Sequence, residues 1–171
     1  SLTAPVLGMN TVDPIGRMDP RYALDLENFF PRLNDVMLRQ GYSDQVTVIK
    51  NGQVESLMAY SAPSGTEALY AASGDTIYNA TQATATASVA SSGFANARWE
   101  HTNFTNTGGT SYLFCVNGSN GLWSFDGSSW GAQAISGATA SAFAHINQHK
   151  NRLWFCMDNT LAAYYLNTGA V

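Results

Sequence analysis

The sequence predicts an all-β protein: antiparallel, blade-like repeats of an incomplete β-propeller, preceded by an extended, Pro-rich N-terminal segment. Three observations support this fold class. Four of the five prolines lie in residues 1–55, similar apolar segments recur beyond them, and only 8 basic and 12 acidic side chains occur in 171 residues. Sheets that are covered on both faces need neutral side chains at most positions, whereas a solvated sheet alternates apolar with charged residues.

Residues 1–55 are expected to form an extended leader with short strands and one hairpin. Closely spaced prolines prevent a long helix, because each fixes φ and lacks an amide donor. Residues 21–30 fit either an amphipathic helical stretch or a strand, and periodicity does not choose between them. Residues 36–42 and 46–49 are expected to be strands, and the Asn-Gly turn at 50–53 predicts a hairpin between 46–49 and a strand at 54–60.

Residues 56–171 contain three similar segments, each with an apolar strand, a turn and a second, aromatic strand. The segments are ALYAASG at 68–74, YLFCVNG at 112–118 and LWFCMDN at 153–159. Each is expected to form an antiparallel hairpin, and a further strand is expected upstream of each. These upstream strands lie at 56–61, 97–104 and 142–148.

The repeats define two to three units, near 56–96, 97–140 and 141–171, of which the last is truncated. A period of about 40–45 residues with up to four short strands is typical of a propeller blade. Propellers need about four to eight blades to close, so the ring cannot close within these units. We therefore expect the chain to be a fragment of a longer protein. The alternatives are a sandwich of the same strands or an oligomer that completes the ring.

The repeats predict no catalytic residue and no cofactor. Asp75, Asp126 and Asp158 fall at expected hairpin turns, where Asp side chains cap the turn backbone. The segment Ser124–Trp130 resembles the Asp-box turn of sialidase-like propellers but is one residue short, and such a turn is structural. A propeller glycoside hydrolase is therefore the least favoured of the three functional hypotheses.

No metal site is predicted either. On a strand, His145 and His149 would lie about 13 Å apart, too far to chelate one ion. Cys115 and Cys156 occupy the same repeat position and are expected to be reduced, buried apolar fillers, with a redox pair as the alternative.

The net charge of −4 and the lack of a Lys/Arg cluster argue against nucleic-acid binding as the main activity. No apolar run approaches the roughly 20 residues of a membrane span. The alternative function is a glycan-binding propeller module on a phage or cell surface, in which Trp99 and Trp130 would stack on sugar rings. The competing interpretation of these tryptophans is packing between blades.

The leader resembles the N-terminal part of the tail nozzle, or hub, proteins of short-tailed bacteriophages, a group that includes packaged-DNA stabilisation and head-completion proteins. The resemblance is carried by PRYALDLENFFPR at 20–32, LRQGY at 38–42 and the blade-like pattern at 113–130. It implies a structural component of the virion, assembled in the bacterial cytoplasm. The component would be a subunit of a homo-oligomeric ring beside other head–tail connector proteins, and DNA would pass it without specific binding.

If this resemblance holds, Arg21, Arg32 and Arg39 are expected to form inter-subunit or inter-domain ion pairs with Asp25, Asp35 or a neighbouring chain. The alternative is a solvated surface, whose ion pairs contribute under about 1 kcal/mol each.

Overall fold

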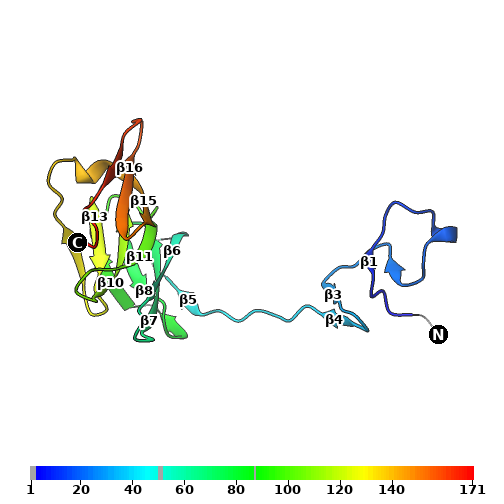
Figure 1. Ribbon diagram of the computed structural model, residues 1–171. Coiled ribbons are helices and arrows are strands. Elements are labelled where there is room, and N and C mark those ends of the chain that lie inside the picture. The colour runs from blue at the N-terminus through cyan, green and yellow to red at the C-terminus, as the bar shows by residue number, and fades with distance from the viewer. Residues whose placement is uncertain (1–2, 50–51, 87) are drawn as a thin grey trace. The chain divides into compact units, whose positions relative to one another are not determined.

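The computed structural model describes residues 3–49, 52–86 and 88–171. The chain divides into two compact units, Ser1–Ser43 and Asp44–Val171 (Figure 1). The boundary lies before the one expected at residue 55, because β5 (Val46–Val48) pairs with β9 (Thr84–Thr86) of the second unit. No helix in the described ranges is long and apolar enough to cross a membrane.

The first unit is built from two small strand pairs. The strands β1 (Gly8–Met9) and β2 (Tyr22–Ala23) pair in parallel, and β3 (Phe29–Pro31) and β4 (Val36–Leu38) form an antiparallel pair. Residues 21–30, for which helix and strand were both open, therefore contain the strand β2 and the start of β3. The short 3-10 turn η1 (Ile15–Arg17) follows Pro14, whose φ of −60° suits a turn.

The hairpin expected between residues 46–49 and 54–60 is wrong. Instead, β5 pairs in parallel with β9, and β6 (Val54–Ser61) pairs with β7 (Glu67–Ser73). Residues 50 and 51 of the expected turn lie outside the described residues. Parallel pairing needs a long crossover, which the chain from β6 to β8 (Thr76–Asn79) provides. The Asn-Gly signal reports turn propensity alone, and it does not identify the partner of the preceding strand.

Two four-stranded antiparallel sheets follow in the second unit. Sheet 1 has the order β10-β8-β7-β6, in which β10 is Ser88–Ser92. Sheet 2 has the order β11-β12-β13-β14, and its strands are Glu100–Thr105, Ser111–Val116, Leu122–Phe125 and Trp130–Gln133. The registers confirm the repeat, because Ala71 lies opposite Leu57 and Tyr78 while Cys115 lies opposite His101 and Trp123.

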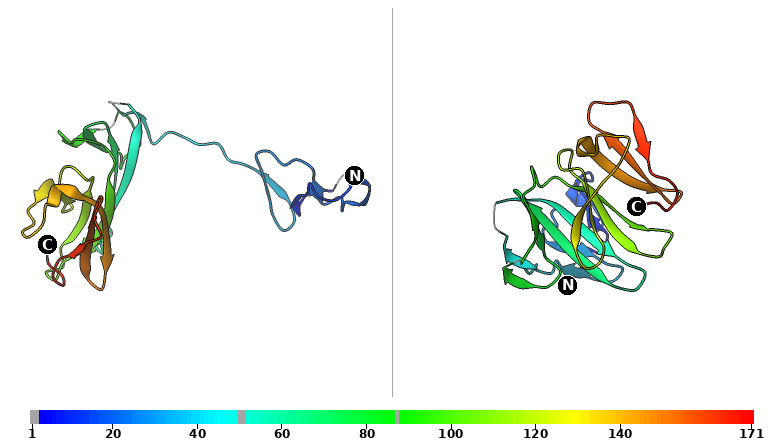
Figure 2. Two further views of the ribbon diagram at one scale, coloured as in Figure 1. Left: turned by 90° about the horizontal axis from the view of Figure 1, so that it is seen from above. Right: turned by 90° about the vertical axis from the view of Figure 1, so that its left-hand side faces the viewer.

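Sheet 3 continues the repeat with three strands. They are β15 (Phe143–His149), β16 (Arg152–Met157) and β17 (Ala163–Tyr165), and the short 3-10 turn η2 (Ala140–Ala142) leads into them. In this sheet Cys156 lies opposite His145 and Ala163, as Cys115 does opposite its partners in sheet 2. The all-β fold and the three repeated sheets are therefore confirmed. Figure 2 shows the sheets following one another.

Sheets 1 and 2 pack through opposite faces of the repeat. Tyr70 of sheet 1 and Cys115 of sheet 2 lie in one buried cluster, although they differ by one position in the repeat and therefore point to opposite faces. The rings of Tyr60 and Tyr70 meet that of Phe125 edge-on, each with centroids 5.1 Å apart. Such edge-to-face pairs add to the stabilisation that comes from burial.

Sheets 2 and 3 pack differently. Phe114 and Phe155 occupy the same repeat position, yet both belong to the second buried cluster, together with Phe104, Phe143 and Leu153. In sheets 1 and 2, the face that carries Tyr70 or Phe114 packs against the next sheet along the chain. Sheet 3 uses the equivalent face, which carries Phe155, to pack against the preceding sheet, sheet 2. Within the described residues the sheets form no closed ring.

Candidate functional site

A groove of about 670 Å³ lies where the first strands of the three sheets come together. These strands contribute the same two repeat positions, 44 residues apart: Ser56–Leu57, Glu100–His101 and Ala144–His145. Glu55, the connection before β11, the turn between β12 and β13, and Asp158 after β16 also line the groove. We refer to this cavity as the groove.

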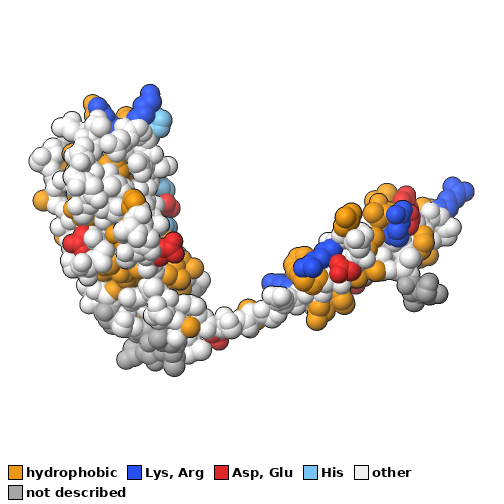
Figure 3. All heavy atoms as spheres, turned by 60° about the horizontal axis from the view of Figure 1, so that its bottom comes forward, with side chains coloured by type: hydrophobic (Ala, Val, Ile, Leu, Met, Phe, Trp, Pro, Cys, Tyr) orange, Lys and Arg blue, Asp and Glu red, His pale blue; other side chains and the backbone are white. Residues whose placement is uncertain are grey.

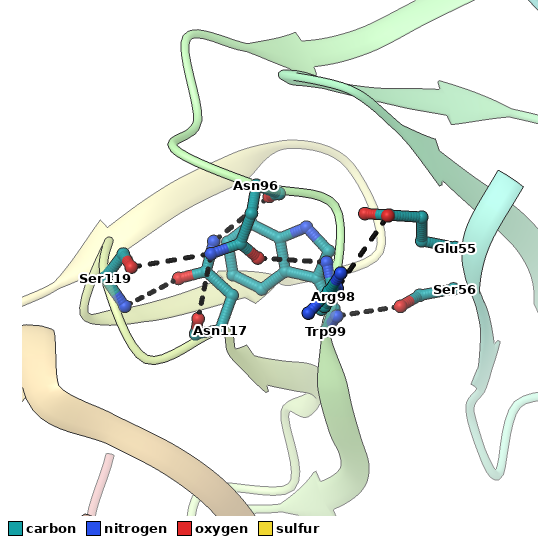
Figure 4. A network of polar contacts seen from close by, with 7 residues as sticks. All are labelled: Glu55, Ser56, Asn96, Arg98, Trp99, Asn117 and Ser119. Carbon is teal, nitrogen blue, oxygen red and sulfur yellow. Dashed lines mark hydrogen bonds and ion pairs between the residues drawn. The ribbon is translucent and has the colours of Figure 1, made fainter. Parts of the chain in front are cut away.

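One wall of the groove is an amide network (Figure 4). Asn96 Nδ2 donates to the carbonyl oxygen of Asn117, and Asn117 Nδ2 donates to that of Asn96, both at 3.2 Å. Asn117 Oδ1 accepts from the backbone amides of Ser119 and Asn120 at 3.1 and 2.8 Å. The two asparagines therefore fix the connection before β11 against the β12–β13 turn.

A second set of contacts joins this connection to sheet 1 (Figure 4). The backbone amide of Trp99 donates to Ser56 Oγ at 2.7 Å, and Arg98 Nε lies 3.7 Å from Glu55 Oε1. The indole ring of Trp99 packs edge-on against Phe94, with centroids 4.9 Å apart. Its Nε1 is buried and has no hydrogen-bond partner in the described structure.

The side chains that line the groove are acidic overall. Among the lining residues, Glu55, Glu100 and Asp158 carry carboxylates, and Arg98 carries the one permanent positive charge. Burial lowers the pKa of His101, and the charge of Glu100 opposes that effect, so His101 is largely neutral at pH 7. The groove thus offers carboxylates, amides and a neutral imidazole, which can hydrogen-bond a polar ligand but repel phosphate. No group of three or more His, Cys, Asp or Glu residues in the described ranges can hold a metal ion.

Trp99 and Trp130, the candidates for sugar stacking, both pack against aromatic neighbours. Trp99 is 5% exposed, which leaves no ring face for a sugar. The half-buried ring of Trp130 lies against Tyr70, with centroids 5.0 Å apart, and against Phe125 at 5.7 Å. Trp99 lines the groove and Trp130 does not, so the groove does not bring the two rings together.

The arginines of the leader make local contacts. Arg21 pairs with Asp19 at 2.7 Å rather than with Asp25 or Asp35, and its hydrogen bond lowers the pKa of Asp19 to about 2. Arg32 donates its backbone amide to the carbonyl oxygen of Asp35 and a side-chain N–H to Met37 Sδ.

Arg39 is exposed and donates its backbone amide to the carbonyl oxygen of Asn28. Among the described residues, none of the three arginines forms an ion pair with Asp25 or Asp35. Contacts of these arginines with a neighbouring chain stay a prediction.

The turn prediction holds for Asp126. Its carboxylate accepts from the backbone amides of Ser128 and Ser129, each at 2.8 Å, and these bonds lower its pKa. Of the two cysteines, Cys115 is buried as expected, whereas Cys156 is exposed. Cys156 is exposed because sheet 3 presents the opposite face to its neighbour.

Sequence reasoning missed the amide wall of Asn96, Asn117 and Ser119. A usable signal was present, because the spacing of 44 residues between His101 and His145 marks first strands that meet at one place.

Neither family models, nor curated proteins, nor solved structures give a match to this chain.

Proposed function

We propose that the chain is a structural subunit of a ring in the tail of a short-tailed bacteriophage, a nozzle or hub that extends the head–tail channel and retains or passes the genome. The observation that supports this role best is the serial packing of sheets 1 and 2, in which one face of a repeat covers the opposite face of the next. Such packing propagates along a chain or around an axis, which suits a scaffold.

The finer part of the proposal is that sheets 1 and 2 are consecutive blades of a propeller. Their strand order is the same, the registers of their first two strands agree from Ser56 and Glu100 onward, and their shared core is rich in aromatic side chains. The groove would then lie along the propeller axis, where the first strands meet. Sheet 3 would join this assembly by a different face.

Electrostatics favours a surface that DNA passes without binding. Residues from Ser56 onward contain three bases, Arg98, Lys150 and Arg152, and five acids. Phosphate binding requires several cations on one face, because affinity comes from neutralising the backbone and releasing its counterions. Figure 3 shows how few charged side chains lie on the visible face of the second unit.

Immunogold electron microscopy of virions from a phage that encodes this chain would test the role. Antibodies against the chain should label the tail, and antibodies against the major capsid protein provide the control. Particles that lack the gene product should lose packaged DNA to added nuclease. The proposal fails if purified virions contain none of the chain, or if the label lies elsewhere on the particle.

A further inference from the structure

We propose that the outer face of sheet 3, formed by Asn147, Trp154, Cys156 and Tyr165, binds the β3–β4 hairpin of a second copy of this chain. The inference rests on the proposed ring of copies and names the contact that would hold it together. Two surfaces carry it: a sheet face whose counterpart is covered within the same molecule, and an aromatic hairpin with exposed rings.

The counterpart of the outer face of sheet 3 is the face of sheet 2 that carries Asn103, Leu113, Cys115 and Phe125. The registers match position by position. Asn103 lies opposite Leu113, and Leu113 lies opposite Phe125. In sheet 3, Asn147 lies opposite Trp154, and Trp154 lies opposite Tyr165. The two faces therefore present an amide, two large apolar side chains and a cysteine in the same arrangement.

In sheet 2 this face is covered by the β6–β7 hairpin. Tyr60 and Tyr70 place their ring edges on Phe125. Asn103 Nδ2 donates to the carbonyl oxygen of Ala59 at 2.8 Å, and Asn103 Oδ1 accepts from the backbone amide of Ser61 at 3.1 Å. The face thus contacts two features of the hairpin that covers it. The side-chain amide of Asn103 binds an extended backbone, and the ring of Phe125 contacts aromatic side chains.

In sheet 3 the same positions are open. Asn147 and Cys156 are exposed, and Tyr165 is 54% exposed. The rings of Trp154 and Tyr165 lie 5.0 Å apart, and the guanidinium of Arg152 lies 5.0 Å from the centre of the Tyr165 ring. These contacts restrain the two rings, so the outer face of sheet 3 has this arrangement without a bound partner.

The β3–β4 hairpin has shorter strands than the β6–β7 hairpin that covers sheet 2 but shares two of its features. It is antiparallel, and it places aromatic beside aliphatic side chains, Phe29 opposite Leu38 and Phe30 opposite Met37. Phe29, Phe30 and Leu38 are 43%, 52% and 61% exposed. Hydrophobic side chains are prominent on the visible surface of the first unit, which contains this hairpin, in Figure 3. Exposed apolar groups of this density are typical of a docking segment.

The alternative occupant from a second copy would be the β6–β7 hairpin of its sheet 1. That hairpin is already covered, because Met58, Tyr60 and Tyr70 are buried against sheet 2 of the same chain. The β3–β4 hairpin, in contrast, is an aromatic hairpin whose rings a second copy has free to offer.

Each copy carries one hairpin and one outer face, which makes the proposal testable with the full chain. We expect the mass of the wild-type protein, measured by sedimentation equilibrium, to rise with concentration. A hairpin variant, Phe29→Ser with Phe30→Ser, and a face variant, Tyr165→Glu, should each stay monomeric. An equal mixture of the two should form a dimer and grow no further, because one intact hairpin meets one intact face.

Thiol alkylation gives a second measurement that needs no substitution. Cys156 should react readily in dilute protein and at least about tenfold more slowly in concentrated protein, as binding covers it. Cys115, with 0% exposure, should stay unreactive throughout and report that the fold is intact.

Several outcomes would overturn the contact. Among these are a monomeric wild-type protein, an oligomer that survives Tyr165→Glu, and a mixture of variants that stays monomeric. Protection of Cys156 that does not depend on concentration would place the hairpin on the sheet of its own chain. If the protein is monomeric but antibodies against it label phage tails, the proposed contact is wrong and the proposed function is still supported.

Discussion

Phe114 and Phe155 hold the same position in consecutive repeats, and both lie in one buried cluster between sheets 2 and 3. A propeller would place them on two successive interfaces, because every blade turns the same face towards the next one. The two phenylalanines therefore show that the third sheet is reversed relative to the step from sheet 1 to sheet 2.

Phe155→Ala tests this reversal. Phe155 is 1% exposed, so its truncation should lower the free energy of unfolding by about 3–5 kcal/mol. Tyr165→Ala, on the outer face of the same sheet, should cost under about 1 kcal/mol in dilute protein, since that side chain is 54% exposed. Urea unfolding measures both values. Equal small losses would mean that Phe155 does not face sheet 2.

Asn103→Ala and Asn147→Ala form a matched pair. Asn103→Ala removes two hydrogen bonds to the backbone of Ala59 and Ser61, and because both backbone groups are exposed to water we expect a loss of about 0.5–1.5 kcal/mol in the free energy of unfolding. Asn147→Ala should change the unfolding free energy of the monomer by under about 0.5 kcal/mol, because this side chain is exposed. Chemical denaturation at low protein concentration would show the difference, and similar losses would contradict it.

Gly127 sits where the β13–β14 turn meets sheet 1. Its φ is +95°, and a Cβ at this residue would lie 2.9 Å from the hydroxyl oxygen of Tyr60. Gly127→Ala should therefore destabilise the protein by about 2–3 kcal/mol, through backbone strain together with displacement of Tyr60.

Gly137→Ala is the control for Gly127→Ala. Gly137 has a similar φ, +86°, but no described atom lies within 4 Å of the position that a Cβ would take. It should incur the backbone strain alone, about 1 kcal/mol. Thermal unfolding compares the two variants, and an equal shift in Tm would show that Tyr60 yields without cost.

Asp126 gives a pH dependence of known sign. The amides of Ser129 and Ser128 lower its pKa in the folded state below the usual aspartate value of 3.8. Its contribution is therefore complete above that value and is lost as the pH falls through the folded pKa. Because the carboxylate is exposed, we expect the free energy of unfolding of the wild type to exceed that of Asp126→Asn by under about 1 kcal/mol at pH 7.

The gap between wild type and Asp126→Asn should shrink below pH 4 in urea titrations at a series of pH values. A gap that grows in acid would mean that the carboxylate does not cap this turn in its charged form.

The repeat could be predicted from sequence because each sheet is local. Segments such as 112–118 pair with their chain neighbours, so the strand periodicity and turn residues contain the information. The site residues were harder to predict. Asn117 hydrogen-bonds Asn96 across 21 residues, and amide side chains in a turn look alike whether or not they meet such a partner.

The non-local steps could not be predicted. Val46 pairs with Thr84, which no local pattern indicates. The reversal of sheet 3 is invisible in the sequence because Phe155 and Trp154 are both large and apolar, so either face of β16 could have been buried. That ambiguity also explains why Cys156 was expected to be buried like Cys115 and is exposed.

The parallel pair of β5 and β9 has a mechanical consequence. The chain passes from the first unit into β5 before it reaches β6, so a force applied to the first unit acts on the β5–β9 pair before it acts on sheet 1. Under tension, β5 is expected to separate from β9 first and to lengthen the connection between the two units, while the aromatic core between sheets 1 and 2 stays intact.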